Sequence, residues 1–140
     1  MIKIVVDTNV IISGLISKGY PNIILNDVIL EDKVTLLLSK DVLSEYTEVI
    51  KRDKFKKYPV FQEKAFSTLN LIKQVGKIIS PKLVINEIKD KSDNKFLELA
   101  IFGKAKFLIT GNINDFTFNR YKTVSIIEPK EFVERYFNTL

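Results

Sequence analysis

Residues 2–9 read IKIVVDTN, a short and mostly β-branched run that ends in a carboxylate and two polar residues. Residues 2–6 are typical of a buried β-strand, and residues 10–12 are apolar again. Burying an ionised Asp7 between two apolar segments is costly unless the charge is paired or bound to a metal. Asp7 therefore either lies just outside the core, caps a helix or belongs to a functional site.

Downstream of this stretch, segments with strand character alternate with segments of helical periodicity. Further strands are predicted at residues 34–38, 77–80, 107–110 and 124–127. Helices are predicted at residues 8–17, 22–31, 40–52, 60–75, 93–103 and 129–137. This alternation favours an α/β fold with a parallel sheet, in which ligands bind beyond the carboxyl ends of the strands. The length of 140 residues fits one domain, residues 1–140, with one core.

The composition is that of an ordinary globular chain, with 46% hydrophobic and 28% charged residues. No apolar run approaches the roughly 18 residues of a transmembrane helix, so no membrane association is expected. The start of the chain lacks the pattern of a signal peptide, because Asp7 and Asn9 interrupt its apolar stretch. We therefore expect a cytoplasmic protein.

The chain contains neither cysteine nor histidine, which excludes several kinds of chemistry. Disulfides, thiolate nucleophiles, zinc sites built from these residues and a histidine general base are all impossible. The remaining carboxylate and amide oxygens are hard ligands that suit Mg²⁺ or Mn²⁺. The net charge of +5 fits either a lysine-rich solvated surface or a polyanionic partner.

Polar side chains follow two of the predicted strands at the point where each strand ends. Asp7, Thr8 and Asn9 follow the first strand, and the segment after strand 107–110 contains Asn112 and Asp115. By themselves the latter two are ordinary turn residues. Because the carboxyl ends of parallel strands meet at one edge of a sheet, both groups lie where a site is expected.

Two predicted helices add further acids. Glu45 borders the apolar arc of helix 40–52, one side chain away from its buried face. Asp93 lies in the first turn of helix 93–103 and shares a face with Phe96 and Ala100. Each also has a simpler interpretation, since Glu45 can be a surface residue and Asp93 can complement the helix dipole.

Together, these four acids converge on one end of the predicted sheet. No Lys or Arg within the motifs is expected to neutralise Asp7, Glu45, Asp93 and Asp115. Such a cluster repels itself, and divalent cations are its simplest stabiliser.

These motifs resemble the PIN domain nucleases, and most closely the toxin components related to VapC. The resemblance rests on DTNVIISGLIS, on Glu45 within LLLSKDVLSEYTEVIKR, and on Asp93 within KSDNKFLELAIFGKAKFLITGNINDF. It covers about residues 2–127 and implies a three-layer α/β/α sandwich with a central parallel sheet. It also implies Mg²⁺- or Mn²⁺-dependent cleavage of RNA, a homodimer and a cognate antitoxin protein.

The resemblance also implies roles for individual residues. Asp7, Glu45 and Asp93 match the three acids that hold the catalytic metal in this family, and Asp115 matches a fourth, more variable acid. The accessory polar positions are Thr8, Asn9, Thr110 and Asn112. Related chains often have Asp at the position of Asn112, so it stays open whether one or two ions act.

A basic stretch follows the helix that contains Glu45. Residues 51–58 read KRDKFKKY, with two aromatic residues among the cations. Cations can hold phosphates and aromatic rings can stack on unpaired bases, although a helix end also favours cations without any ligand. The candidate RNA-binding residues are Lys51, Arg52, Lys54, Lys56 and Lys57.

The sequence thus predicts a metal-dependent endoribonuclease that hydrolyses phosphodiester bonds, in the role of a toxin of a toxin–antitoxin pair. The alternative is a PIN domain without catalytic activity that binds RNA or a protein partner. An α/β phosphatase of the DxD type is disfavoured because position 9 holds Asn9 in place of an acid. A phospho-receiver domain is disfavoured because no acidic pair follows the first strand.

Overall fold

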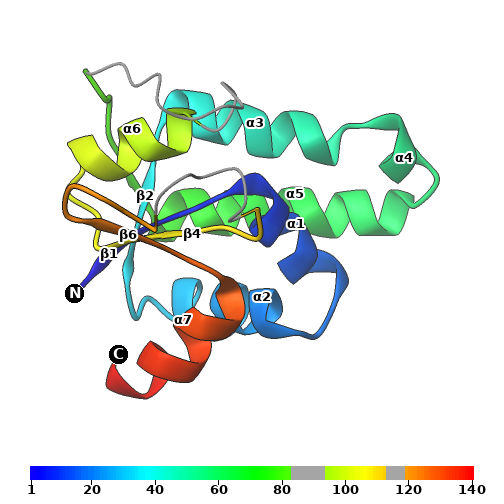
Figure 1. Ribbon diagram of the computed structural model, residues 1–140. Helices are drawn as coiled ribbons and strands as arrows, with labels where there is room; N and C mark the ends of the chain where they lie inside the picture. Colours follow the sequence, from blue (N-terminus) through cyan, green and yellow to red (C-terminus); the bar gives the residue numbers. More distant parts are fainter. Residues whose placement is uncertain (83–93, 113–118) are drawn as a thin grey trace.

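A computed structural model describes residues 1–82, 94–112 and 119–140 of the chain (Figure 1). These residues form a six-stranded sheet in the order β3-β2-β1-β4-β6-β5. The strands are β1 (Lys3–Val6), β2 (Thr35–Leu38), β3 (Lys77–Ile78), β4 (Phe107–Ile109), β5 (Arg120–Tyr121) and β6 (Val124–Ile127). Only the pairing of β5 with β6 is antiparallel, and the other four pairings are parallel.

Helices cover both faces of this sheet. They are α1 (Thr8–Ile16), α2 (Tyr20–Ile23), the π-helix η1 (Ile24–Ile29), α3 (Lys40–Ile50), α4 (Asp53–Lys56), α5 (Pro59–Val75), α6 (Asn94–Phe102), α7 (Pro129–Tyr136) and the 3₁₀ turn η4 (Phe137–Thr139). Helices α3 and α6 lie above the strands in Figure 1, and α2 and α7 lie below them. The predicted three-layer α/β/α fold with a central parallel sheet is confirmed. No helix within the described ranges is long and apolar enough to cross a membrane.

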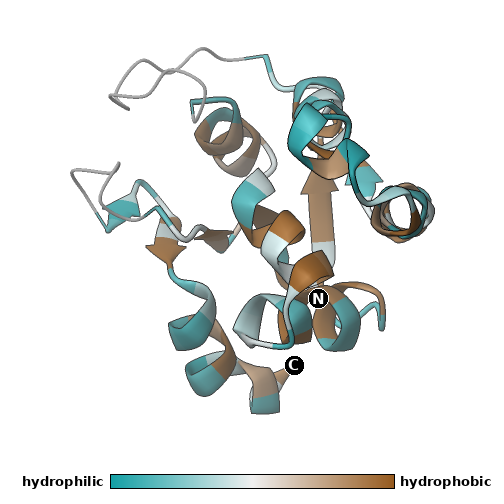
Figure 2. Cartoon of the chain, turned by 90° about the vertical axis from the view of Figure 1, so that its right-hand side faces the viewer, coloured by the Kyte–Doolittle hydropathy of each residue, from teal (hydrophilic) through white to brown (hydrophobic). Residues whose placement is uncertain are grey.

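The first strand lies at the centre of the sheet, as its sequence predicts. Ile4, Val5 and Val6 are completely buried, and Figure 2 shows the inner strands in the brown of hydrophobic residues, whereas the helices around them carry both teal and brown. β1 pairs in parallel with both β2 and β4. The carboxyl ends of these three strands therefore meet at one edge, where Asp7, Ser39 and Thr110 follow them.

Several segments differ from the prediction. The strand expected at residues 77–80 is shorter, because only Lys77–Ile78 pair with β2 at the exposed edge of the sheet. The helix expected at residues 22–31 starts earlier, at Tyr20, and continues as the π-helix η1. Over a single turn, the apolar periodicity of an α-helix and that of a π-helix cannot be told apart. The two-residue strand β5 was not predicted. Its sequence has no strand pattern, and it is a strand because it pairs with β6.

Gly14 provides a first test of the packing between α1 and α2. A Cβ atom at this position would lie 2.8 Å from the backbone oxygen of Pro21 and 3.2 Å from the Cβ of Leu25. Backbone cannot yield as a flexible side chain can, so Gly14→Ala is expected to cost about 1–3 kcal/mol of stability. A thermal melt checks this, with Gly111→Ala as the control because nothing lies within 4 Å of its added Cβ. Equal melting temperatures for both variants would contradict the close approach.

Candidate functional site

Asp7 is the first residue after β1 and the N-cap of α1. Its Oδ1 accepts a hydrogen bond of 3.0 Å from the backbone N–H of Val10, and its Oδ2 accepts one from the Thr110 hydroxyl. Its own N–H donates to the oxygen of Ile109, at 3.0 Å, which extends the pairing of β1 with β4 by one residue. Asp7 is only 6% exposed, so the residue is both a cap and a fixed, buried carboxylate.

The surroundings of Asp7 disfavour its charge. Burial raises the pKa of the Asp7 carboxyl above its ordinary value, and the nearby Glu45 charge raises it further, while the hydrogen bonds from Thr110 and Val10 oppose both effects. No lysine or arginine in the described part of the chain forms an ion pair with Asp7. A cation next to this carboxylate would therefore be stabilising.

Glu45 lies on α3 and is brought close to Asp7 through Thr8. The Thr8 hydroxyl donates to Oε2 of Glu45, and Thr8 directly follows Asp7 in the chain. The N-cap Ser39 starts α3 immediately after β2, so this helix runs away from the same sheet edge. The hydroxyl of the buried Tyr46 donates to the backbone oxygen of Val6, which ties α3 to the end of β1. The structure thus brings Asp7 and Glu45 together, as predicted.

The expectation that no cation within the motifs neutralises the acids is wrong for Glu45. Lys95 Nζ lies 2.9 Å from Glu45 Oε1, and the two side chains are 28% and 18% exposed. Lys95 belongs to the first turn of α6, and Figure 1 shows α6 next to α3. The packing of α6 against α3 brings these two residues together, although they are 50 positions apart in the sequence. The spacing of residues within one motif does not predict such a contact.

The remaining acids of the predicted site, Asp93 and Asp115, lie outside the described residues. Their neighbours are described: Asn94 is buried at the start of α6, and the N–H of Asn112 donates to the Thr110 hydroxyl, at 3.0 Å. The Asn112 side chain is exposed. Among residues 1–82, 94–112 and 119–140, no group of three or more acids meets.

The described donors nevertheless match the chemistry of a hard cation. Asp7 and Glu45 supply carboxylate oxygens, which accept hydrogen bonds from neighbouring backbone, hydroxyl and ammonium groups. Thr8 and Thr110 hold these carboxylates in place without adding charge. Such an oxygen set suits Mg²⁺ or Mn²⁺, and a complete coordination shell would need further ligands from the chain or from water.

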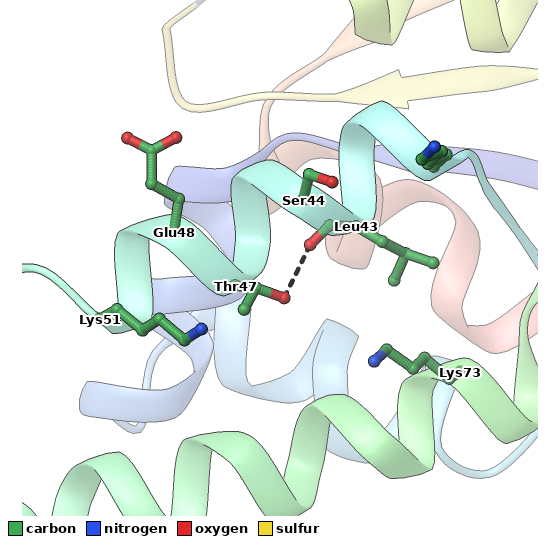
Figure 3. Close-up of a pocket in the computed structure, with 7 residues that line it drawn as sticks. Leu43, Ser44, Thr47, Glu48, Lys51 and Lys73 are labelled. Carbon is green, nitrogen blue, oxygen red and sulfur yellow. Dashed lines mark hydrogen bonds between the residues drawn. The ribbon is translucent and has the colours of Figure 1, made fainter.

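The basic stretch does not act as one surface. Lys51 lies in a groove of about 500 Å³ between α3 and α5, together with Lys40 and Lys73. Figure 3 shows Lys51 and Lys73 extending toward the space between the two helices, whereas Glu48 points away from it. This groove lies on a different face of α3 from Glu45, since none of its lining residues belongs to the acidic site.

Lys54 faces a second groove, which borders the acidic site. This groove has a volume of about 680 Å³ and is lined by the exposed Asn9 and other residues of α1, together with Lys54, Phe55, Tyr58 and Phe61. Asn9 lies two residues after Asp7. Of the five predicted RNA-binding residues, Lys54 is therefore the one that shares a groove with a residue of the predicted site.

The other basic residues of the stretch lie at the surface. Arg52 pairs with Glu48 at 3.9 Å and Lys56 pairs with Asp53 at 3.0 Å, while Lys57 is exposed. Exposed pairs of this kind contribute little to stability. The short helix α4 within this stretch turns successive cations in different directions, so a run of charges in the sequence is divided among several faces.

Comparison with known proteins relates the chain to a sequence family, to a curated protein and to solved structures, among them two complexes. A family model described as "PIN domain" matches residues 3–114. The uncharacterized protein MJ1680 of Methanocaldococcus jannaschii is 35% identical over 144 residues, which cover 96% of this chain and 92% of that protein.

Both solved complexes contain a chain with the same fold. In the crystal structure of VapBC2 from Rickettsia felis bound to a DNA fragment from their promoter, the match has a TM-score of 0.58 at 22% identity and covers 91% of this chain and 98% of that one. In the structure of FitAB bound to an IR36 DNA fragment, it has a TM-score of 0.59 at 20% identity and covers 90% and 94%.

Proposed function

Because the chain belongs to the PIN domain family, whose members are generally nucleases, we propose that it is a metal-dependent endoribonuclease. Its substrate is RNA, its reaction is hydrolysis of a phosphodiester bond, and its cofactor is Mg²⁺ or Mn²⁺. The main supporting observation is the buried Asp7 carboxylate, which lies beside Glu45 at the carboxyl edge of the sheet and has no described ion-pair partner.

The proposed catalytic and metal-binding residues are Asp7, Glu45, Asp93 and Asp115. Asp93 is joined by one peptide bond to Asn94, at the end of α6 that Lys95 ties to Glu45. Asp115 comes three residues after Asn112, whose backbone N–H donates to the Thr110 hydroxyl. This connectivity in the sequence supports including both acids in the proposed site.

Within this proposal, the protein's own residues fix the geometry of the site. Thr110 and the Val10 N–H hold the two oxygens of Asp7, and Thr8 holds one oxygen of Glu45. When bound, a divalent ion lowers the pKa of water and neutralises charge on the phosphate. Asn9 and Asn112 are exposed and are proposed to donate hydrogen bonds to the RNA.

Cleavage of a mixed RNA pool tests this function. The purified protein is expected to cut RNA in the presence of Mn²⁺ and to lose that activity in EDTA. Activity that survives EDTA would overturn the proposal of a metal-dependent reaction.

We further propose a toxin role in the cytoplasm, with a homodimer as the working form and an antitoxin protein as partner. Support comes from the fold shared with chains of the VapBC2 and FitAB complexes. Copurification with a small DNA-binding protein encoded by a neighbouring gene would support the antitoxin, and light scattering would measure the oligomeric state.

A non-catalytic PIN domain is the second candidate, and the ion pair between Lys95 and Glu45 favours it. A carboxylate that is already balanced has less need of a metal ion. Calorimetric titration with Mn²⁺ separates the two functions, because a domain of this second kind would bind no Mn²⁺.

RNA binding is expected to depend more on Lys54 than on Lys51. Lys54 lines the groove that contains Asn9, whereas Lys51 lines the groove between α3 and α5. In an inactive background, Lys54→Ala should weaken RNA affinity about three- to tenfold, as the loss of one phosphate contact does. Filter binding at two salt concentrations checks this, with Lys51→Ala as the matched control. Equal losses for both variants would contradict the assignment of the groove.

A further inference from the structure

Lys95 occupies an unusual position for a cation. It lies in the first turn of α6, where the helix dipole disfavours positive charge. Its ammonium is 2.9 Å from Glu45 Oε1, and both side chains are mostly shielded from solvent. The helix dipole therefore disfavours a lysine at this position, and the carboxylate of Glu45 offsets that cost.

The two carboxylates of the site are consequently unequal. Both oxygens of Glu45 have a partner, the ammonium of Lys95 and the hydroxyl of Thr8. Among the described residues, Asp7 receives only neutral donors, which are the backbone N–H groups of Val10 and Asn9 and the hydroxyl of Thr110. Within the described residues, the negative charge at Glu45 is balanced by the protein itself, and the charge at Asp7 is not.

We propose that Lys95 is a built-in counter-cation of the acidic site, which competes with a divalent ion for Glu45. The inference rests on the proposed function, because it assumes that a divalent ion binds at Asp7 and Glu45. Lys95 acts through Glu45, so it is a positioning residue that sets the metal affinity and holds Glu45 in place in the metal-free protein. The same charge also opposes a second ion beside Glu45.

The size of the effect follows from Coulomb's law. A single and a double positive charge about 6 Å apart in a water-like dielectric repel each other enough to change a dissociation constant about tenfold. Removing the charge of Lys95 is therefore expected to tighten Mn²⁺ binding by about that factor. It should also lower the melting temperature of the metal-free protein, because Asp7 and Glu45 then face each other without a balancing charge.

Calorimetric titration with Mn²⁺ tests the inference in the full chain. Lys95→Gln and Lys95→Met should both bind Mn²⁺ about tenfold more tightly than the wild type, and two neutral variants guard against a folding defect in one of them. Lys95→Arg retains the charge and should keep the affinity of the wild type. Lys130→Gln is the matched control, since it removes the same charge from an exposed ion pair with Glu134 on α7.

Thermal melts provide a second measurement. Saturating Mn²⁺ should raise the melting temperature of Lys95→Gln by more than that of the wild type. If Lys95 were merely structural, its neutral variants would melt earlier but bind Mn²⁺ with unchanged affinity, which would overturn this inference and leave the proposed function intact. If the wild type bound no Mn²⁺ at all, the metal-dependent function would fail, and this inference with it.

Discussion

Replacing Asp7 by Asn is expected to slow RNA cleavage by about a thousandfold or more, which corresponds to about 4 kcal/mol of lost transition-state stabilisation. The substitution removes the charge of the more buried of the two described carboxylates of the site while keeping its shape. An Asn side chain can still accept the hydrogen bond from the Val10 N–H and can donate to the Thr110 hydroxyl. The fold should therefore survive while metal binding is lost.

The measurement compares initial cleavage rates of one RNA substrate across a series of Mn²⁺ concentrations. Glu45→Gln should show a large loss as well, and Glu48→Gln, one turn further along α3 and exposed, is the matched control that should retain activity. Full activity of purified Asp7→Asn would contradict the assignment of the site. A loss that high Mn²⁺ restores would indicate that Asp7 only helps to bind the ion.

The architecture around this site was predictable because its signals are local. The run at residues 2–6 is short, apolar and β-branched, so it specifies a buried central strand, and Asp7 at its end specifies where the core stops. Glu45 was placed correctly because helical periodicity sets it at the border of the apolar arc of α3, where Tyr46 is buried and Glu48 is exposed.

What the sequence did not reveal depends on contacts between distant segments. Lys95 was overlooked because its partner is 50 positions away, although its place two residues after Asp93 is a signal that could have drawn attention to it. The apolar periodicity of α3 likewise gives no sign that the Tyr46 hydroxyl bonds the end of β1. The cations around Lys51 and Lys54 were grouped by their proximity in the chain, whereas Lys51 at the end of α3 and Lys54 on α4 line two separate grooves.

Asp7→Asn is also expected to stabilise the metal-free protein at neutral pH, the opposite of its effect on activity. Burial raises the pKa of the Asp7 carboxyl in the folded state above its ordinary value of 3.8. As pH rises through the interval between the unfolded and the folded pKa, the unfolded chain releases its proton first. The free energy of unfolding of the wild type therefore falls across this interval relative to the variant and stays lower above it.

Denaturant titrations in EDTA at a series of pH values measure this difference. The two proteins should have similar stability at the acid end, and the advantage of Asp7→Asn should grow with pH to a constant value. The control Asp53→Asn, at an exposed carboxylate on α4, should show no such growth.

Adding Mn²⁺ should reverse the order of stability at neutral pH. An ion at one hundred times its dissociation constant stabilises the folded wild type by about 2.7 kcal/mol, whereas Asp7→Asn has lost the ligand that would bind it. A wild type that is already more stable than Asp7→Asn in EDTA would show that the protein itself compensates the buried charge. In that case Asp7 would be a structural cap of α1. Its surroundings would not disfavour the charged carboxylate, and that support for a metal site would be lost.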